Sequence, residues 1–234
     1  MRKLGLLLVL VGVGVCGCAS NNSKSLGDEF VGLPYAQSPL GEGRLPDDDP
    51  TIRFDAFDCT TLVETVLANG DEKKLNQIRY KDGKVGFLDR NHFIESDWLQ
   101  NNADKVKNVS EKFGAVSQRT VVINKKNWLK KVHNIDAEFA PVMVVLDYLP
   151  YSAVKKIDAK NELIVLFVAD NPKMRDKIGT DLAVVHMGFL LPNGILRHAS
   201  SEMNAVVDVD FYQYLQKRMQ NKNNIGIVLV EILK

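Results

Sequence analysis

Residues 54–70, FDAFDCTTLVETVLANG, contain the feature that decides the fold, a cysteine at the start of a helical pattern. Apolar side chains follow Cys59 at helical spacing, and Asn69-Gly70 is a typical helix end. Asp58 is a suitable N-cap residue because its carboxylate can accept an N–H of the first turn. The segment therefore predicts a helix whose first turn carries the thiol.

The N-terminus has the pattern of an export signal. A basic start, MRK, precedes an apolar run that is too short to span a bilayer with polar flanks. Residues 15–18, VCGC, resemble a lipoprotein signal peptidase site, at which residues 1–17 are removed and Cys18 becomes the lipidated terminus. Simple cleavage after Gly17 or Ala19 is the alternative. We expect an exported lipoprotein that faces the periplasm.

Residues 18–29 are small and polar, as a flexible tether between a lipid and a domain should be. Acyl chains on Cys18 would hold the domain at a membrane without a spanning helix. Because Ala19 rather than aspartate follows this cysteine, the outer membrane is the expected location in a cell with two membranes.

Residues 30–234 are expected to form a single domain. The chain has 234 residues, of which 45% are hydrophobic and 25% charged, and this is enough for a sizeable core. Two of the 30 basic residues leave with the signal, so 29 acidic residues give a net charge of −1. No basic stripe with interleaved aromatic residues favours a nucleic-acid partner. The oligomeric state stays open.

Export makes Cys59 unusual. Cys16 is discarded and Cys18 takes the lipid, so Cys59 has no partner for an intramolecular disulfide. Exported proteins normally pair their cysteines or avoid them, because a lone thiol is easily oxidised. Cys59 is therefore either a small buried hydrophobe or a reactive group, and its neighbours must decide.

The C-terminal third is rich in short, β-branched runs. They follow one another too closely for helical crossovers, which predicts antiparallel pairing. The runs are ELIVLFVAD, LAVVHMGFLL, GILRHAS, NAVVDVDF and IGIVLVEIL, with a helical pattern at 211–220 before the last one. Residues 71–160 suggest a helical insertion, with a strand-like run at RTVVIN and either a strand or a buried connection at PVMVVLDYLP. Together these patterns predict an α+β fold.

A thiolate nucleophile needs an imidazole partner, and the chain has four histidines. His133 falls in a basic helical pattern and is most simply a surface residue. His92, in DRNHF, is either functional or caps a loop. His186 and His198 lie in strand-like runs on either side of PNG. One histidine in such a run is usually a buried core residue with a hydrogen-bond partner. Two histidines that flank one hairpin make this purely structural interpretation less attractive.

The loop PNG, residues 192–194, decides whether these two histidines meet. A two-residue turn would point them to opposite faces of the hairpin. A three-residue loop with Gly194 in the left-handed conformation would place His198 across from Gly188, on the same face as His186. His198 could then fix the tautomer of His186, as the third member of a catalytic triad does.

The start of a helix also suits a nucleophilic thiol. Unpaired N–H groups and the helix macrodipole favour negative charge, so we expect a lowered pKa for Cys59. The same amides can stabilise an oxyanion. Such chemistry needs no cofactor and no metal, and none of the histidines has the spacing with carboxylates that a zinc amidase requires.

Four segments follow one another along the chain: FDCTTLVETVLA, IRYKDGKVGFLDRNHFIESDW, LAVVHMGFL and LRHAS. In this order they resemble the N-acetylmuramoyl-L-alanine amidase-like family, a branch of the NlpC-like cell-wall cysteine peptidases with a papain-like fold. The likeness extends from about Phe30 to the end of the chain. Leu62 stands where phenylalanine is usual in the family.

The resemblance implies a catalytic cysteine at Cys59, a general base at His186 and an orienting residue at His198. It also suggests that the hydroxyl of Tyr35, in the segment GLPY, helps to form the oxyanion hole. Further candidates for holding the oxyanion, the sugar or the stem peptide are Asp58, Thr60, Arg90, Asn91 and His92.

The resulting hypothesis is a lipid-anchored cysteine amidase that hydrolyses the N-acetylmuramoyl-L-alanine bond of peptidoglycan or its fragments. One alternative is an endopeptidase with the same triad that cuts between D-glutamate and the diamino acid. The other is a cell-wall-binding lipoprotein whose active site has decayed. The presence of Cys59, His186 and His198 together argues against a decayed site.

Overall fold

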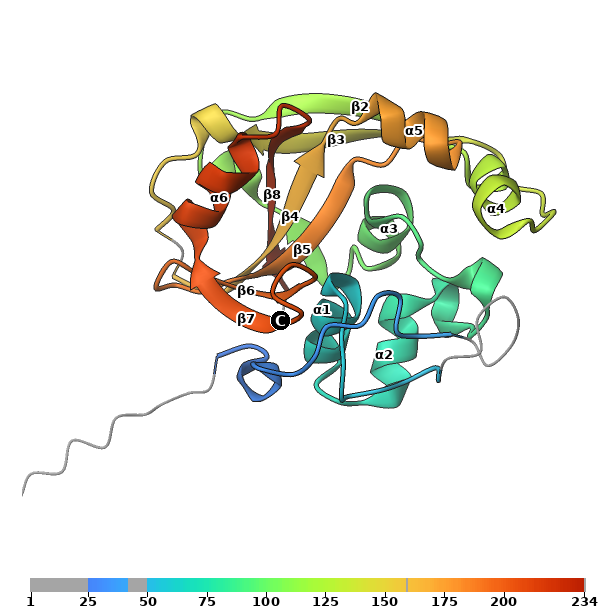
Figure 1. The fold of residues 1–234 in the computed structure, drawn as a ribbon, viewed down its shortest axis with the longest axis horizontal. Helices are drawn as coiled ribbons and strands as arrows, with labels where there is room; N and C mark the ends of the chain where they lie inside the picture. The colour runs from blue at the N-terminus through green and yellow to red at the C-terminus, as the bar shows by residue number, and fades with distance from the viewer. Residues whose placement is uncertain (1–24, 42–49, 159, 234) are drawn as a thin grey trace, which may run out of the picture.

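The computed structural model describes residues 25–41, 50–158 and 160–233 (Figure 1). The predicted signal peptide and the lipidation site at Cys18 lie outside these residues, as does most of the predicted tether. Among the helices of the described ranges, none has both the length and the apolar composition that a membrane span requires.

An antiparallel sheet forms the centre of the fold (Figure 1). Its strands in the described residues are β1 (Val106–Asn108), β2 (Ser117–Ile123), β3 (Val142–Pro150), β4 (Leu163–Ala169), β5 (Val184–Leu190), β6 (Ile195–Ser200), β7 (Ala205–Asp210) and β8 (Asn224–Ile232). The strand order is β2-β3-β8-β4-β5-β6-β7, and β1 pairs with β8 outside this path. The last five strands coincide with the five apolar runs of the C-terminal third, so the predicted antiparallel sheet is confirmed.

The helices cover both faces of this sheet (Figure 1). They are α1 (Cys59–Ala68), α2 (Glu72–Arg79), α3 (Leu99–Asn101), α4 (Lys125–His133), α5 (Pro172–Ile178) and α6 (Phe211–Met219), with a π-helix at Ile94–Trp98 before α3. Short 3₁₀-helices lie at Asp28–Phe30, Lys81–Gly83, Phe87–Asp89, Ser110–Lys112 and Tyr151–Ala153. The predicted helix at 211–220 is confirmed as α6.

Helix α1 begins and ends as its sequence predicts. Asp58 is the N-cap: its Oδ1 accepts the N–H of Thr61 at 2.8 Å, while the hydroxyl of Thr61 accepts the N–H of Asp58 at 2.9 Å. This reciprocal pair is a capping box, which satisfies two backbone donors at the start of a helix. Asn69 ends α1 in the left-handed conformation, with φ 51°. Cys59 is thereby fixed as the first residue of the helix.

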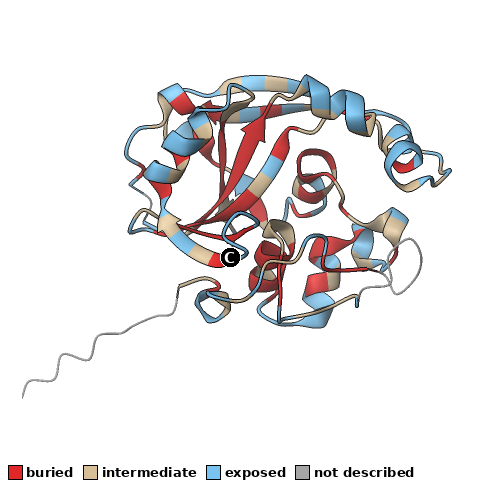
Figure 2. Ribbon diagram, viewed as in Figure 1, coloured by how far each residue is buried: buried red, intermediate tan, exposed pale blue. Residues whose placement is uncertain are grey.

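The central strand β4 is buried on both faces. In β4, Ile164 and Leu166 belong to the core cluster on the α1 side, whereas Val165 and Phe167 belong to the cluster that contains residues of α6. A strand covered on both faces needs no polar alternation, which explains the continuous apolar run ELIVLFVAD. Figure 2 shows the central strands largely buried and the outer helices α4 and α5 largely exposed.

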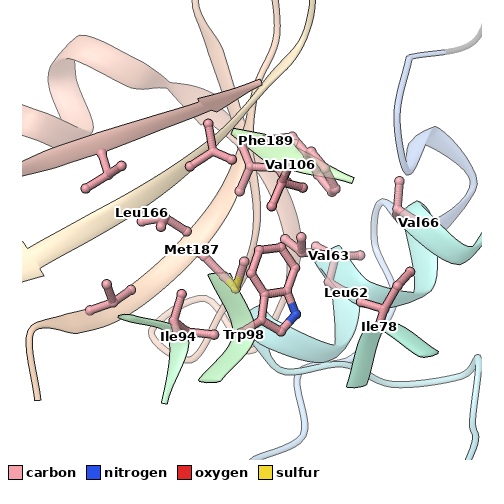
Figure 3. Packing of buried hydrophobic residues seen from close by; sticks show 14 of the residues in the cluster. Leu62, Val63, Val66, Ile78, Ile94, Trp98, Val106, Leu166, Met187 and Phe189 are labelled. Carbon is pink, nitrogen blue, oxygen red and sulfur yellow. The ribbon is translucent and has the colours of Figure 1, made fainter. Parts of the chain in front are cut away.

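Helix α1 packs against β5 and β6. Figure 3 shows Leu62 and Val63 of α1 beside Trp98, with Met187 and Phe189 of β5 close by. Each of these side chains is at most 1% exposed. The helix that carries the cysteine is therefore held rigidly on the strand that carries His186.

Residues 71–160, for which we expected a helical insertion, also contain β1, β2 and β3, which join the central sheet. This corrects the predicted organisation of the domain. Strands β2 and β3 lie at one end of the strand order, and many of their side chains are exposed. Both segments were recognised as strand-like runs, but the pairing of β3 with the distant strand β8 and of β2 with β3 is not visible in the local sequence.

Candidate active site

Cys59 lies where the start of α1 meets β5. Its side chain packs against the core cluster on the α1 side, and its sulfur lies 3.9 Å from the hydroxyl of Thr60. The backbone N–H of Met187, the residue after His186, is close enough to lower the pKa of the thiol. The thiol therefore lies close to the backbone of β5 at the residue that follows His186.

The protonation state of this thiol differs from the sequence-based expectation. Burial raises the pKa of Cys59 to about 12, and the negative charge of Asp58 acts in the same direction. The N–H groups of Met187 and Thr60 oppose these effects without overcoming them. The prediction of a lowered pKa was wrong because desolvation of the thiolate outweighs the stabilisation at the helix start. In the structure Cys59 is a neutral thiol.

The hairpin between β5 and β6 has the loop that brings the two histidines together. Phe189 pairs with Arg197, and Leu190 pairs with Leu196, which leaves a three-residue loop with Gly194 at φ 80°. The same register sets Gly188 opposite His198. The predicted register is therefore confirmed.

His186 and His198 contact each other directly. The Nε2 atom of His186 lies 2.8 Å from Nδ1 of His198, a hydrogen-bond distance, and the two rings meet edge to face. His198 is 3% exposed, so its ring is held by the core. Because Nε2 of His186 is engaged in this bond, Nδ1 is the nitrogen of that ring left to act on another group.

Both imidazoles are neutral in the structure. Burial lowers the pKa of His186 well below its usual range, with further lowering by His198 and Arg218. Burial also lowers the pKa of His198 to about 4. Tyr214 of α6 lies against both rings, at centroid distances of 6.3 Å from His186 and 5.0 Å from His198. Burial raises the pKa of Tyr214, although the charge of Arg218 opposes this effect, so its phenol is neutral beside the two histidines.

Tyr35 also lies at this site. It forms an isolated parallel bridge with Phe57, two residues before the cysteine. Burial raises the pKa of its phenol, and the negative charge of Asp58 adds to this effect. The hydroxyl of Tyr35 therefore stays protonated and is able to donate a hydrogen bond.

A cavity of about 500 Å³ opens next to the start of α1. It is lined by Ser38, Asp58, Thr60, Thr61, Glu64, Phe87, Arg90, Asn91, His92, Trp128, Val132 and His133. Five candidates named from the sequence, Asp58, Thr60, Arg90, Asn91 and His92, thus line one cavity. Cys59, His186 and His198 are not among the residues that line this cavity.

Arg90 and Asn91 are both anchored to the protein. The guanidinium of Arg90 donates to the carbonyl of Leu40 at 2.8 Å. The amide of Asn91 donates to the carbonyl of Ile78 at 2.9 Å and accepts from Asn101 at 2.6 Å. Asn91 is buried, so its side chain holds the loop together, whereas Arg90 gives the wall of the cavity a positive charge.

His92 is packed among aromatic rings at the cavity wall. Its Nε2 lies 2.7 Å from the carbonyl of Phe87, and because a carbonyl only accepts, Nε2 carries the proton. Its ring centroid lies 4.7 Å from those of Phe87 and Trp128. Burial lowers the pKa of His92 well below its usual range. The ring is therefore neutral, and its Nδ1 is an acceptor.

Two features of this cavity were missed in the sequence. His133, expected as a surface residue, lies 4.6 Å from Trp128 between ring centroids and lines the cavity. Glu64 pairs with Arg79 at 2.7 Å, and both side chains are almost fully buried. The position of His133 was not recognisable, because only tertiary contacts bring α4 to the cavity. Glu64 had one signal in the sequence, which is a charged residue inside an apolar helical stripe.

Solved structures of other proteins share this fold. A DUF1460 protein from Legionella pneumophila str. Philadelphia 1 is 25% identical, with a TM-score of 0.80 over 89% of this chain and 87% of that one. An N-acetylmuramoyl-L-alanine amidase from Bacteroides uniformis ATCC 8492 is 24% identical, with a TM-score of 0.68 over 89% and 96% of the two chains. The fold is thus a mixed α and β fold on an antiparallel sheet, of the kind found in amidase-like structures.

The model of the AmiA-like family, described as N-acetylmuramoyl-L-alanine amidase-like, matches residues 25–225. The chain belongs to this family, as the resemblance of its motifs predicted. No curated protein sequence matches the chain. Family membership supports hydrolase activity of a cell-wall amidase type, on a substrate related to peptidoglycan.

Proposed function

We propose that this protein is a cysteine amidase that hydrolyses the bond between the lactyl group of N-acetylmuramic acid and L-alanine, in peptidoglycan or its fragments. The observation that carries the proposal is the 2.8 Å contact between His186 of β5 and His198 of β6, the two strands against which the helix of Cys59 packs. A neutral thiol, a neutral base and a third residue that orients the base are the parts that nucleophilic acyl transfer requires.

In the proposed acylation, the sulfur of Cys59 attacks the lactyl carbonyl while Nδ1 of His186 takes the thiol proton. This requires Nε2 of His186 to carry a hydrogen and to donate it to Nδ1 of His198, which fixes the tautomer. General-base transfer during attack suits this site, because both partners are neutral at rest. The negative charge that develops on the carbonyl oxygen is stabilised by N–H groups at the start of α1 and by the hydroxyl of Tyr35.

When the tetrahedral intermediate collapses, the carbon–nitrogen bond breaks and the imidazolium of His186 protonates the departing amine of L-alanine. A thioester then joins Cys59 to the muramoyl group. His186, again neutral, takes a proton from water as the water attacks the thioester, and returns it to the sulfur. The products are the free sugar acid and a stem peptide with an L-alanine amino terminus.

The cavity beside α1 is proposed to hold the part of the substrate next to the scissile bond. Arg90 supplies positive charge, and the rings of Phe87, His92 and Trp128 supply flat apolar surface, on which a sugar ring can pack. We propose further that the domain is a papain-like, NlpC-type fold, exported and held at a membrane by a lipid on Cys18.

The test is to incubate the protein with a muropeptide of known structure and to identify the products by mass spectrometry. The proposal predicts a free sugar acid and a peptide that begins with L-alanine, whereas an endopeptidase would leave a dipeptide on the sugar. Cys59→Ala should abolish release. Thr65→Ala is the matched control, since Thr65 is a buried residue of the same helix whose hydroxyl has no hydrogen-bond partner among the described residues. Undiminished release by Cys59→Ala would overturn the proposal.

A further inference from the structure

Glu95, in the segment FIESDW, is a buried carboxylic acid that the proposed mechanism does not use. It is 2% exposed and lies in the π-helix Ile94–Trp98, in which the N–H of Trp98 bonds to the carbonyl of Phe93. π-Helical turns are rare and often occur at functional sites. Its carboxylate reaches the start of β5.

The carboxylate of Glu95 holds the residue from which β5 begins. Its Oε1 accepts the N–H of Ala183 at 2.6 Å. The carbonyl of Ala183 in turn accepts the N–H of Ala169, at the end of β4, at 2.8 Å. Both backbone groups of Ala183 are therefore fixed, one by the neighbouring strand and one by Glu95.

Immediately after this point the two strands change register. His186 pairs with Phe167, but Val184 pairs with Val168, so Val185 is an extra residue in β5. This is a β-bulge, a device that turns a strand and redirects its side chains, often next to active sites. Val185 is 37% exposed, whereas Val184 directly before it and Met187 two residues after it are buried. Loss of the bulge would shift the strand by one residue and turn His186 to the other face.

The burial of the Glu95 carboxyl group is unfavourable in itself. Its Oε2 is buried and has no hydrogen-bond partner among the described residues. Burial raises its pKa, although the N–H groups of Ala183 and Val184 act in the opposite direction. A carboxyl group buried with one oxygen unsatisfied lowers stability, and this cost is offset by the hydrogen bond that its other oxygen accepts from Ala183.

We infer that Glu95 is a positioning residue that holds the bulge before His186 and so keeps His186 in contact with His198. The inference rests on the proposed function in that His186 is the base of the reaction. Glu95 acts through the backbone of Ala183 and touches neither the substrate nor the reacting atoms. This gives the ESD part of the family-specific block a role that is separate from the cavity wall formed by Arg90 and His92.

Two variants separate the loss of the hydrogen-bond acceptor for Ala183 from a change in side-chain packing at position 95. Glu95→Gln keeps a side-chain oxygen for the N–H of Ala183, whereas Glu95→Met has similar length and no acceptor. The matched control is Ser110→Ala. Ser110 is 1% exposed and its hydroxyl accepts the N–H of Leu229 at 2.9 Å, so it is an equally buried acceptor for a strand N–H, on β8.

Two readouts are needed, turnover of a defined muropeptide and the downfield proton NMR signal of the hydrogen bond between His186 and His198. That signal is assigned by its loss in His198→Leu. We expect Glu95→Met to lower kcat at least tenfold, with KM within threefold, and to abolish the signal. Glu95→Gln should keep the signal and at least a third of kcat. Ser110→Ala should keep both the NMR signal and kcat, even if its Tm is lower than that of wild type.

The inference is overturned if Glu95→Met retains the signal and a kcat within threefold of wild type. If Glu95→Met does not fold, Glu95→Asp takes its place, because its carboxylate is one methylene short of Ala183; an unchanged signal in that variant would also overturn the inference. The NMR arm needs no substrate. A wild-type protein without amidase activity, whose signal is still lost in Glu95→Met, would refute the proposed function and leave the role of Glu95 standing.

Discussion

His186 meets His198 through a single hydrogen-bond distance of 2.8 Å, from Nε2 of the first ring to Nδ1 of the second. The proposed mechanism requires the second ring to accept this hydrogen bond, which leaves Nδ1 of the first ring for the thiol. A histidine as the orienting residue has one consequence that a carboxylate would not have. Because the second ring is neutral, the charge of the imidazolium formed during catalysis is balanced only by the developing negative charge on the substrate and sulfur.

Replacement of His198 tests this role. Asn can place its amide oxygen close to the position of Nδ1, whereas Leu has a similar shape and no acceptor. We expect His198→Leu to lower kcat/KM by roughly 10- to 100-fold, a typical cost of removing a partner that orients a functional imidazole. The kcat/KM of His198→Asn should fall less, because its amide oxygen can still accept the hydrogen bond. The measurement is steady-state hydrolysis of a defined muropeptide at one pH, and equal losses in the two variants would contradict an orienting role.

The reactivity of Cys59 toward iodoacetamide should increase steadily with pH. An exposed thiol reaches its plateau just above its pKa of about 8.5, but burial raises the pKa of Cys59 to about 12. Alkylation of the peptide that contains Cys59, followed by mass spectrometry, should therefore be slow at pH 7 and still rising beyond pH 10. The unfolded chain is the control and should show the ordinary plateau. Rapid alkylation at pH 5 to 7 would instead indicate a resting ion pair with His186.

The burial of His198 should make the fold sensitive to acid. Its pKa is lowered to about 4 in the folded chain, whereas about 6.5 is expected when the chain is unfolded. Above pH 6.5 both states are neutral; below it the unfolded state binds more protons, so stability falls as the pH approaches 4. His198 should contribute a loss of about 3 kcal/mol by pH 4. Comparison of urea unfolding of wild type and His198→Asn across pH 4 to 7 isolates this contribution, and a constant difference would contradict it.

Gly188 should be essential for the contact between the histidines. A Cβ at this position would lie 2.6 Å from the carbonyl oxygen of Arg197 and 2.8 Å from Cβ of His198. Gly188→Ala should therefore push β6 away, at a cost of roughly 1–3 kcal/mol in the free energy of unfolding. The activity of Gly188→Ala should fall by more than the loss of folded protein explains, because the molecules that remain folded have a displaced His198.

Gly86→Ala is the control for this prediction. Its backbone is extended, and the nearest atom to a new Cβ is a side-chain oxygen of Asp89 at 3.5 Å. Thermal unfolding and muropeptide hydrolysis of both variants provide the comparison. Full activity of Gly188→Ala would show that the spacing of the two strands does not matter.

The parts of the fold with strong local signals were predictable. The start of α1 follows from Asp58 and the apolar stripe, and the hairpin register follows from the glycine in PNG, because turn chemistry fixes pairing over a short range. The segment IRYKDGKVGFLDRNHFIESDW, residues 78–98, was visible as a motif of the family. Its internal division, with Arg90 and His92 at the cavity and Glu95 at β5, was not.

The remaining features depend on contacts that a local pattern does not contain. The pKa of Cys59 was predicted in the wrong direction because the helix start is visible in the sequence, whereas the burial that opposes it comes from packing on β5. Trp128 and His133 reach the cavity from a helix that the sequence marks only as basic. The bulge at Val185 arises between two strands that are separately well predicted, and its position is set by a side chain about 90 residues earlier.

The decisive measurement is the mass of the covalent intermediate. The protein is mixed with a defined muropeptide, quenched in acid within the first turnover, and digested so that the peptide containing Cys59 can be weighed. The proposed amidase predicts an added mass equal to the N-acetylmuramoyl acyl group, lost in Cys59→Ala. An added mass that includes L-alanine and D-glutamate would identify an endopeptidase. Turnover with no adduct on Cys59, and with Cys59→Ala equally active, would contradict the proposed mechanism.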